Sequence, residues 1–194
     1  MRKLLIIGLI IFGQLFANED VNITNNSQTS IIEENNDFQS YKIEVIVKKK
    51  IMTFYGIDDN RNIIPIKQFI VATPKTTIEY PKELGRVVKV DLDPWWYPTD
   101  KTIEEFKKHK NICLPSAVPP GDKQNYMGSF KIILSNSTKE RGSVYRIHGN
   151  IDPKSIGKRS SGGCVRMHNE EGREFAILVK NILEQGKQVT MLYI

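Results

Sequence analysis

Hydrophobic and polar residues alternate along much of the chain after position 40, a pattern typical of β-strands with one buried face. The segments with this alternation, or with a short apolar run of strand length, are 43–47, 51–55, 63–72, 87–92, 130–134, 144–147 and 188–193. A polar cluster at 58–60 predicts a turn between two of them. The pattern therefore predicts a mainly β domain.

Two segments have helical spacing instead. A helix is predicted over 170–185, with Asn169 as its N-cap and Gly186 as its stop. The apolar residues on one face of this helix are Phe175, Leu178, Val179, Ile182 and Leu183. A shorter helix is predicted from Thr102, as the N-cap, to about His109. The domain is thus expected to be mainly β with one long helix near its end.

The first 17 residues have the pattern of a secretory signal peptide. Arg2 and Lys3 are followed by an apolar run over 4–16 and then by Ala17, a small residue at the expected cleavage point. An uncleaved membrane anchor is the alternative, but the run is short and interrupted by glycines. We therefore expect export to the periplasm or cell envelope, with no stable membrane insertion after cleavage.

Residues 18–40 are polar and rich in asparagine, which predicts a flexible linker before a single domain at 41–194. The formal net charge is +6, a balance compatible with an anionic cell-wall polymer. No compact Lys/Arg stripe interleaved with aromatic residues is present in the sequence. The charge pattern therefore predicts no nucleic-acid binding.

The stretch from Val144 to Asn169 carries the candidate chemistry. His148 ends a strand-like run, and Cys164 follows after fifteen intervening residues, within a Ser-Ser-Gly-Gly frame. A thiol acts as a nucleophile in its thiolate form, and an imidazole that takes its proton is a common way to form one. Such pairing predicts a pKa below the ordinary value for Cys164. The paired glycines allow backbone N–H groups to face a developing oxyanion.

Two other interpretations of these residues were open. Export favours disulfides, so a Cys113–Cys164 bridge is an alternative, although it would consume the nucleophile. His168 could be combined with His148 and Cys164 as zinc ligands, but no further ligand lies at a recognisable spacing. We therefore expect no metal and no cofactor.

The same stretch resembles the signature of the L,D-transpeptidase (YkuD-type) catalytic domain, I-H-G-[TN]-x-x-P-x-S-I-G followed by S-[HK]-G-C-[IV]-R-[ML]-x-N. This chain matches from Ile147 through Gly157 and from Ser161 through Asn169. It differs at Gly162, where most members carry histidine. The passage P-P-G at 119–121 with N-Y-M-G at 125–128 also resembles a family loop that lines the donor groove, with Tyr126 in place of proline.

The resemblance implies a YkuD-type β-sandwich with one long helix after the catalytic cysteine and a short helix in the substrate-loop region. It implies Cys164 as the nucleophile and His148 as the general base, with the Gly149 carbonyl orienting the imidazole. The residues expected to form the oxyanion site or to support its loop are Gly163, Ser161, Gly162 and the N–H of Cys164 itself. The expected substrate-binding residues are Arg166, Asn150 and Tyr145, with a structural ion pair as the alternative role of Arg166.

The reaction implied is removal of the terminal D-alanine from a peptidoglycan stem tetrapeptide through a thioester acyl-enzyme, followed by transfer to an amine acceptor. The partners are then donor and acceptor stem peptides, or a protein to be attached to the wall, and we expect a monomer. Water as acceptor would make the protein an L,D-carboxypeptidase. A wall-binding protein whose catalysis has decayed is the alternative from another class, and Gly162 is the feature in its favour.

Trp95, Trp96 and Tyr97 are interpreted as core residues, with substrate packing as the alternative.

Overall fold

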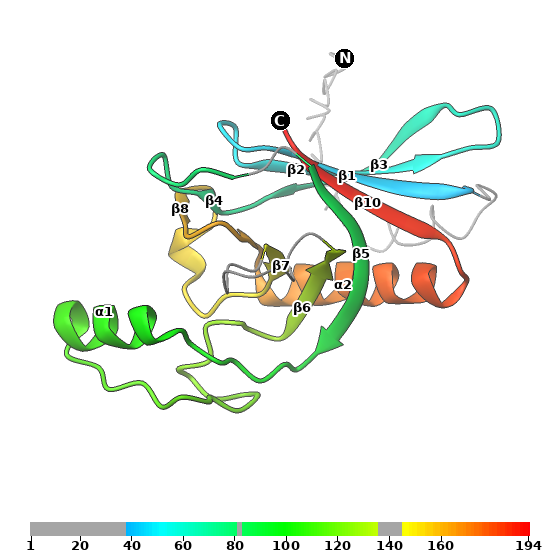
Figure 1. Ribbon diagram of the computed structural model, residues 1–194. Helices are drawn as coiled ribbons and strands as arrows, with labels where there is room; N and C mark the ends of the chain where they lie inside the picture. Colours follow the sequence, from blue (N-terminus) through cyan, green and yellow to red (C-terminus); the bar gives the residue numbers. More distant parts are fainter. Residues whose placement is uncertain (1–37, 81–82, 136–144) are drawn as a thin grey trace, which may run out of the picture. The chain divides into compact units, whose positions relative to one another are not determined.

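The computed structural model describes residues 38–80, 83–135 and 145–194, which are coloured in Figure 1. The expected signal peptide lies outside the described residues, as does 18–37 of the expected linker. The last residues of the expected linker, 38–40, already belong to the folded domain. The side chain of Phe38 is buried, and strand β1 begins at Ser40. Neither helix of the described ranges is long and apolar enough to span a membrane.

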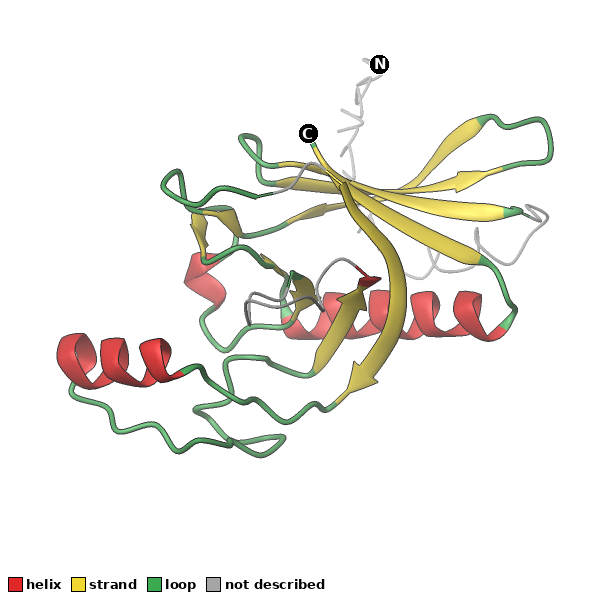
Figure 2. Ribbon diagram, in the orientation of Figure 1, coloured by secondary structure: helices red, strands yellow, loops and turns green. Residues whose placement is uncertain are grey.

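Eight of the strands form one mixed sheet in the order β3-β2-β1-β10-β5-β6-β7-β9, shown in yellow in Figure 2. Their bounds are β1 (Ser40–Ile46), β2 (Ile51–Ile57), β3 (Ile63–Ile70), β5 (Glu83–Leu92), β6 (Phe130–Leu134), β7 (Arg146–His148), β9 (Val165–Arg166) and β10 (Gln188–Tyr193). The short strands β4 (Thr73–Pro74) and β8 (Arg159–Ser161) pair separately. Within the large sheet, β1 with β10 and β7 with β9 are parallel pairs, and the other pairs are antiparallel.

Strand β5 connects the two halves of this sheet. Its first residues pair with β10, as Arg86 does with Thr190, and its later residues pair with β6, as Leu92 does with Phe130. Figure 1 shows β5 as a long curved ribbon that descends from β1, β2 and β10 to β6 and β7. The predicted mainly β fold is confirmed, and the two halves of the large sheet share this strand.

The long helix α2 (Asn169–Glu184) packs against β5, β6 and β10. Its residue Phe175 also contacts Phe54 of β2 and Phe69 of β3. The helix ends at Glu184, and Gly186, which follows the C-cap Gln185, is left-handed with φ of 76°, which confirms the predicted stop. The predicted cap is wrong, because His168 is the N-cap and Asn169 is the first residue of the helix.

The short helix α1 (Asp100–Lys110) is also present, but it begins earlier than predicted. Thr99 is its N-cap, with Oγ1 accepting from the N–H of Thr102, so Thr102 lies in the first turn. Beside α1 a second apolar cluster is built from Trp96, Leu114, Val118 and Met127. This region therefore has its own small core.

The three adjacent aromatic residues divide between the core and the surface. Trp96 forms an isolated bridge with Val118 and is 8% exposed, which confirms the core interpretation for this residue. Trp95 and Tyr97 are 49% and 68% exposed, so the core interpretation is wrong for them. Side chains alternate between the two faces of an extended segment, and only Trp96 points inward.

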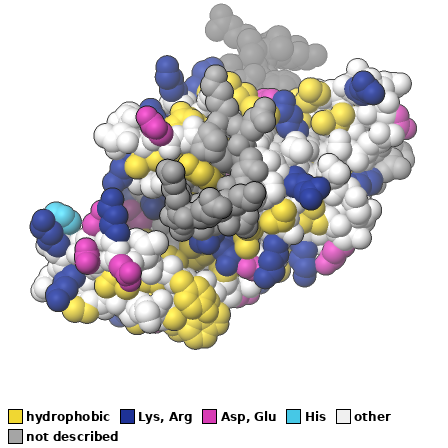
Figure 3. All heavy atoms as spheres, in the orientation of Figure 1, with side chains coloured by type: hydrophobic (Ala, Val, Ile, Leu, Met, Phe, Trp, Pro, Cys, Tyr) yellow, Lys and Arg dark blue, Asp and Glu magenta, His cyan; other side chains and the backbone are white. Residues whose placement is uncertain are grey.

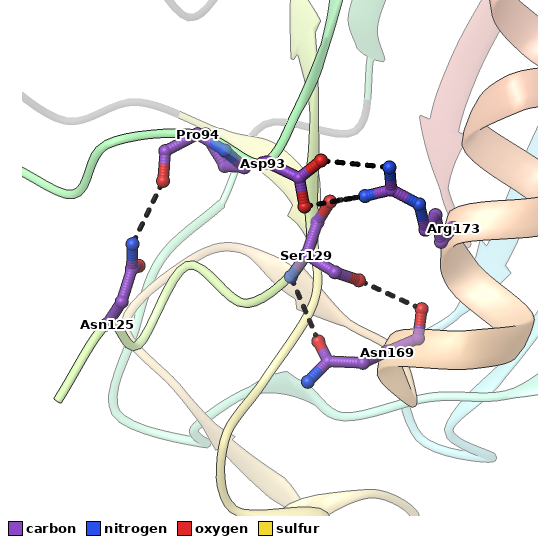
Figure 4. A network of polar contacts seen from close by, with 6 residues as sticks. All are labelled: Asp93, Pro94, Asn125, Ser129, Asn169 and Arg173. Carbon is purple, nitrogen blue, oxygen red and sulfur yellow. Dashed lines mark hydrogen bonds and ion pairs between the residues drawn. The ribbon is translucent and has the colours of Figure 1, made fainter. Parts of the chain in front are cut away.

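Buried Asn125 fixes the loop before β6. Its Nδ2 donates to the carbonyls of Pro94 and Pro119, both at 2.9 Å, and its Oδ1 accepts from the N–H of Met127 at 3.0 Å. The contact with Pro94 is drawn in Figure 4. The loop 119–128 is therefore held by one amide side chain rather than by regular secondary structure.

Asn169 links the start of α2 to two other segments. Its Oδ1 accepts from the N–H of Ser129 at 3.2 Å and from the N–H of Asn150 at 3.0 Å. Figure 4 shows the amide pointing away from the helix toward Ser129, where Arg173 also donates to the Ser129 carbonyl. A Cβ at Gly128 or Gly149 would overlap this oxygen, so both positions require glycine. The side chain predicted to cap the helix instead joins three segments.

Replacing Asn169 with alanine should destabilise the fold. Two backbone N–H groups would lose their acceptor, and we expect a loss of about 2 kcal/mol or more in the free energy of unfolding. Asn169→Asp keeps an oxygen acceptor and places a negative charge at a helix N-terminus, so it should retain most of the stability. Urea unfolding of the two variants measures this, and an equal loss in both would contradict the acceptor role.

Candidate active site

Strands β7 and β9 place the candidate base and nucleophile on neighbouring chain segments. Their parallel register pairs Ile147 with Val165 and His148 with Arg166. Ile147 and Val165 are fully buried, so the alternating residues on either side of them lie on the opposite face. Cys164 directly precedes Val165, and it therefore shares this face with His148. Fifteen intervening residues return the chain beside its own strand, as the sequence indicated.

The imidazole of His148 is buried and held by the neighbouring backbone. Its Nδ1 lies 2.6 Å from the carbonyl oxygen of Gly149, the contact that the sequence analysis expected. Because a carbonyl only accepts, Nδ1 carries the proton and Nε2 keeps its lone pair in the neutral ring. Burial, together with the positive charges of Arg166 and Arg146, lowers the pKa of His148 to about 3. The ring is therefore neutral at pH 7 and able to accept a proton at Nε2.

The pKa of the Cys164 thiol is shifted in the opposite direction to the one predicted. Burial raises its pKa, although backbone and side-chain contacts with Arg146 and the charge of Arg166 oppose this effect. Desolvation outweighs the favourable charges because it penalises the thiolate directly. The predicted lowering of this pKa is therefore wrong. The disulfide alternative is also wrong, because Cys164 is not bridged to Cys113, which is exposed.

The backbone around Cys164 is held by Ser161. Its buried Oγ donates to the carbonyl of Cys164 at 2.5 Å and accepts from the N–H of Gly163 at 3.3 Å. The N–H of Gly163, one of the two expected oxyanion donors, is thus already used inside the loop. Gly163 has φ of 136°, a conformation that favours glycine. Gly162 is exposed, and a Cβ there would have no neighbour within 4 Å.

Tyr193 orients the peptide bond before the nucleophile and was not found from the sequence. Its hydroxyl donates to the carbonyl of Gly163 at 2.7 Å, and burial raises its pKa, so it stays protonated. In a trans peptide the C=O and the following N–H point in opposite directions. By fixing the Gly163 carbonyl, Tyr193 therefore also fixes the direction of the Cys164 N–H. No local pattern marks this residue, because it lies on β10 and only folding brings it to the loop.

The three expected substrate-binding residues all lie close to this centre. Asn150 donates through Nδ2 to the carbonyl of Asp152 at 2.7 Å and to Ser155 Oγ at 2.5 Å, whereas its buried Oδ1 has no partner. Tyr145 lies against Gly163, since a Cβ built there would be 3.2 Å from the tyrosine Cε1. The backbone of Arg166 is bonded to Ala72, with N–H to O distances of 3.0 and 2.8 Å.

A cavity of about 510 Å³ lies elsewhere and does not include Cys164 or His148. It is lined by Trp95, Tyr97, Lys180 and residues of β5 and β6. Figure 3 shows one face of the molecule, on which basic and acidic side chains are interspersed. The candidate site is thus defined by the strand register rather than by this cavity.

A comparison with protein families matches residues 40–191 to the L,D-transpeptidase catalytic domain. The chain is 33% identical over 128 residues to the Escherichia coli (strain K12) protein named "Probable L,D-transpeptidase ErfK/SrfK", covering 66% of this chain and 38% of that protein. It is 35% identical over 86 residues to "Probable L,D-transpeptidase YbiS" of the same strain, covering 44% of this chain and 25% of that protein. The matches therefore span well under two thirds of the length of these relatives.

Among solved structures, the catalytic domain of the E. faecium L,D-transpeptidase is similar with a TM-score of 0.47 and 16% sequence identity. The similarity covers 81% of this chain and all of that domain.

Tyr193→Phe should slow acylation of Cys164 while sparing simple alkylation. Loss of the hydroxyl frees the Gly163 peptide, and misdirecting one oxyanion donor should cost about tenfold to a hundredfold in the acylation rate. Acylation by a carbapenem, followed by intact mass, measures the first reaction. Alkylation by iodoacetamide passes through no oxyanion and serves as the control. Equal slowing of both reactions would indicate a general loss of loop structure instead.

Alkylation of Cys164 should rise with pH only in the alkaline range. Because burial raises the pKa of this thiol, its thiolate fraction grows above the ordinary thiol pKa of about 8.5. The rate of iodoacetamide modification, measured from pH 6 to pH 10 in a Cys113→Ser background, tests this. A midpoint below the ordinary value would show that the thiol is ionised at rest.

Proposed function

The chain belongs to the L,D-transpeptidase catalytic domain family, and we propose that it is an exported cysteine transpeptidase acting on peptidoglycan stem peptides. The observation that carries this proposal is the placement of His148 and Cys164 on one face of paired strands. The imidazole there is neutral, with Nε2 as its available acceptor. We place the enzyme in the periplasm or cell envelope.

In the first half of the reaction, Cys164 attacks the carbonyl carbon of the third stem residue while its proton passes to Nε2 of His148. The resulting tetrahedral intermediate expels the amino group of D-alanine, which takes the proton from the imidazolium. A thioester acyl-enzyme remains. Since the resting pair is neutral, the proton moves as the sulfur attacks and not beforehand.

In the second half, an acceptor amine attacks the thioester and gives its proton to Nε2 of His148. Collapse of the intermediate breaks the C–S bond, and the sulfur regains a proton from the imidazolium. The product is a 3–3 crosslink or a protein attached to the wall. The Gly149 carbonyl keeps the imidazole oriented through both halves, because its bond to Nδ1 also suits the protonated ring.

The surrounding residues support the binding part of this proposal. The N–H of Cys164, fixed through Tyr193, is aimed to stabilise the oxyanion. The buried Oδ1 of Asn150, without a partner, is suited to accept a backbone N–H of the donor. Tyr145 lines the loop beside Gly163, and Arg166 supplies a positive charge for a substrate carboxylate.

Two alternatives share parts of this site. With water as the acceptor, the same thioester would make the protein an L,D-carboxypeptidase. The other alternative is a wall-binding protein that has lost its catalytic activity, which glycine at position 162 suggests. The intact arrangement of His148, Gly149 and Ser161 favours catalysis over decay, because the groups that move the proton and hold the loop are present.

Incubation with purified muropeptides, with products read by mass spectrometry, tests the function. We expect loss of one alanine from tetrapeptide donors and formation of a crosslinked product. Cys164→Ala should abolish both, and Cys113→Ser should retain a substantial fraction. Alanine loss with only tripeptide as product would indicate the carboxypeptidase. No reaction together with retained binding to peptidoglycan would indicate the decayed protein.

A carbapenem acylation assay distinguishes the roles of His148 and Gly162. Loss of general-base catalysis in His148→Ala should slow acylation by about 10²–10⁴-fold. Gly162→His should change the rate much less, since a side chain at this exposed position meets no neighbour. Carbapenem acylation followed by intact mass compares them. Normal acylation of His148→Ala, with a large gain in Gly162→His, would overturn the assignment of the base.

A further inference from the structure

A second arginine lies beside the nucleophile and was not identified from the sequence. The parallel register that pairs Ile147 with Val165 also brings the residues before them, Arg146 and Cys164, side by side. Arg166, two residues after Cys164, pairs with His148 on the same face. Both guanidinium groups interact electrostatically with the sulfur. The sulfur of Cys164 therefore lies near two positive charges on the same face of the strands.

These charges have no partner of opposite sign among the described residues. None of the salt bridges in that part of the chain includes Arg146 or Arg166. The Nε atom of each is buried and has no hydrogen-bond partner. Burial lowers the pKa of both groups, yet arginine remains charged in proteins. Unpaired buried charges are costly, so two at one site are suited to bind an anion.

The two carboxylates that interact electrostatically with these arginines also bind other groups. Asp91 interacts with Arg146 over a longer range, but it forms salt bridges with Lys89 at 2.7 Å and Lys131 at 3.0 Å. Asp152 interacts with Arg166 in the same way, while its Oδ1 accepts from the N–H of Lys154 at 3.1 Å. Among the residues that the structure describes, no carboxylate is therefore paired with either guanidinium.

We propose that Arg146 and Arg166 together form the receptor for the terminal carboxylate of the residue that leaves the donor peptide. This deepens the proposed function and, for the identity of the donor, rests on it. A guanidinium binds a carboxylate through two parallel N–H···O bonds. The carboxylate of a terminal D-alanine lies only a few bonds from the scissile carbonyl, so it suits charges that flank the attacking sulfur. The receptor would select donors with a free carboxylate next to the cleaved bond.

The receptor can be tested without any stem peptide. Iodoacetate and iodoacetamide both lose iodide to the attacking sulfur, and they differ in carrying a carboxylate or a neutral amide. We expect Cys164 to prefer iodoacetate, relative to glutathione under the same conditions, by about tenfold, as one charge-assisted hydrogen bond allows. The rate ratio of the two reagents is measured in the Cys113→Ser background.

Variants assign this preference to the two arginines. Arg146→Gln and Arg166→Gln should each remove most of it, and Arg146→Lys should keep part of it because the charge remains. Arg61→Gln removes an exposed charge in the turn between β2 and β3, at the other edge of the sheet, and should leave the ratio unchanged. The Cys113→Ser protein with both arginines present is the reference. If its ratio of iodoacetate to iodoacetamide rates is no higher than that of glutathione, the proposal is overturned. An equal fall in Arg61→Gln would also overturn it.

A second measurement identifies the carboxylate that is bound. Tetrapeptide donors ending in D-alanine are compared with the same peptides ending in D-alanine amide, by the rate of acyl-enzyme formation. We expect the free acid to be preferred by about tenfold or more, and Arg146→Gln to remove most of that preference. Equal rates for acid and amide would overturn the assignment to this carboxylate. Failure of both peptides, with the iodoacetate preference intact, would count against the proposed function but not against the anion receptor.

Discussion

The position of the active site depends on one amide oxygen, Oδ1 of Asn169. It accepts from Ser129, at the end of the substrate-loop region, and from Asn150, just after the histidine. Asn169 itself begins the helix that follows the nucleophile segment. Three segments far apart in the sequence therefore meet at one atom, and the glycines at 128 and 149 leave room for it. Both glycines and the asparagine belong to the motifs found in the sequence. This packing explains their presence there as much as catalysis does.

The electrostatics of the site follow from burying a thiol and an imidazole beside two arginines. The positive charges and burial both favour neutral His148, whereas for Cys164 burial opposes the charges and prevails. The imidazole and the thiol are thus both neutral. A carboxylate bound between the arginines would offset the charges that depress the pKa of the histidine, and would therefore make it a stronger base when substrate is present. Substrate binding and base strength are coupled through the same two side chains.

The sequence predicted those features that local patterns encode. Strands with several alternating residues, such as β1 and β10, and the amphipathic helix α2 were found because burial repeats at a fixed period. Strands β4, β8 and β9 are too short to show a period. The roles of Arg146 and Tyr193 depend on pairing between distant segments, so no local signal marks them. Asn169 looked like a helix cap because the same side chain suits a cap and a tertiary acceptor.

The departure at Gly162 can be judged from how the nucleophile loop is held. Ser161 and Tyr193 bind the carbonyls of Cys164 and Gly163, and these bonds use residues on either side of position 162. The glycine itself is exposed, and space is open around its Cβ position. A histidine there would therefore add a side chain to the surface of the loop without replacing any contact that shapes it. Since the proton acceptor lies on β7 and is fixed by Gly149, glycine at position 162 removes neither the base nor the frame.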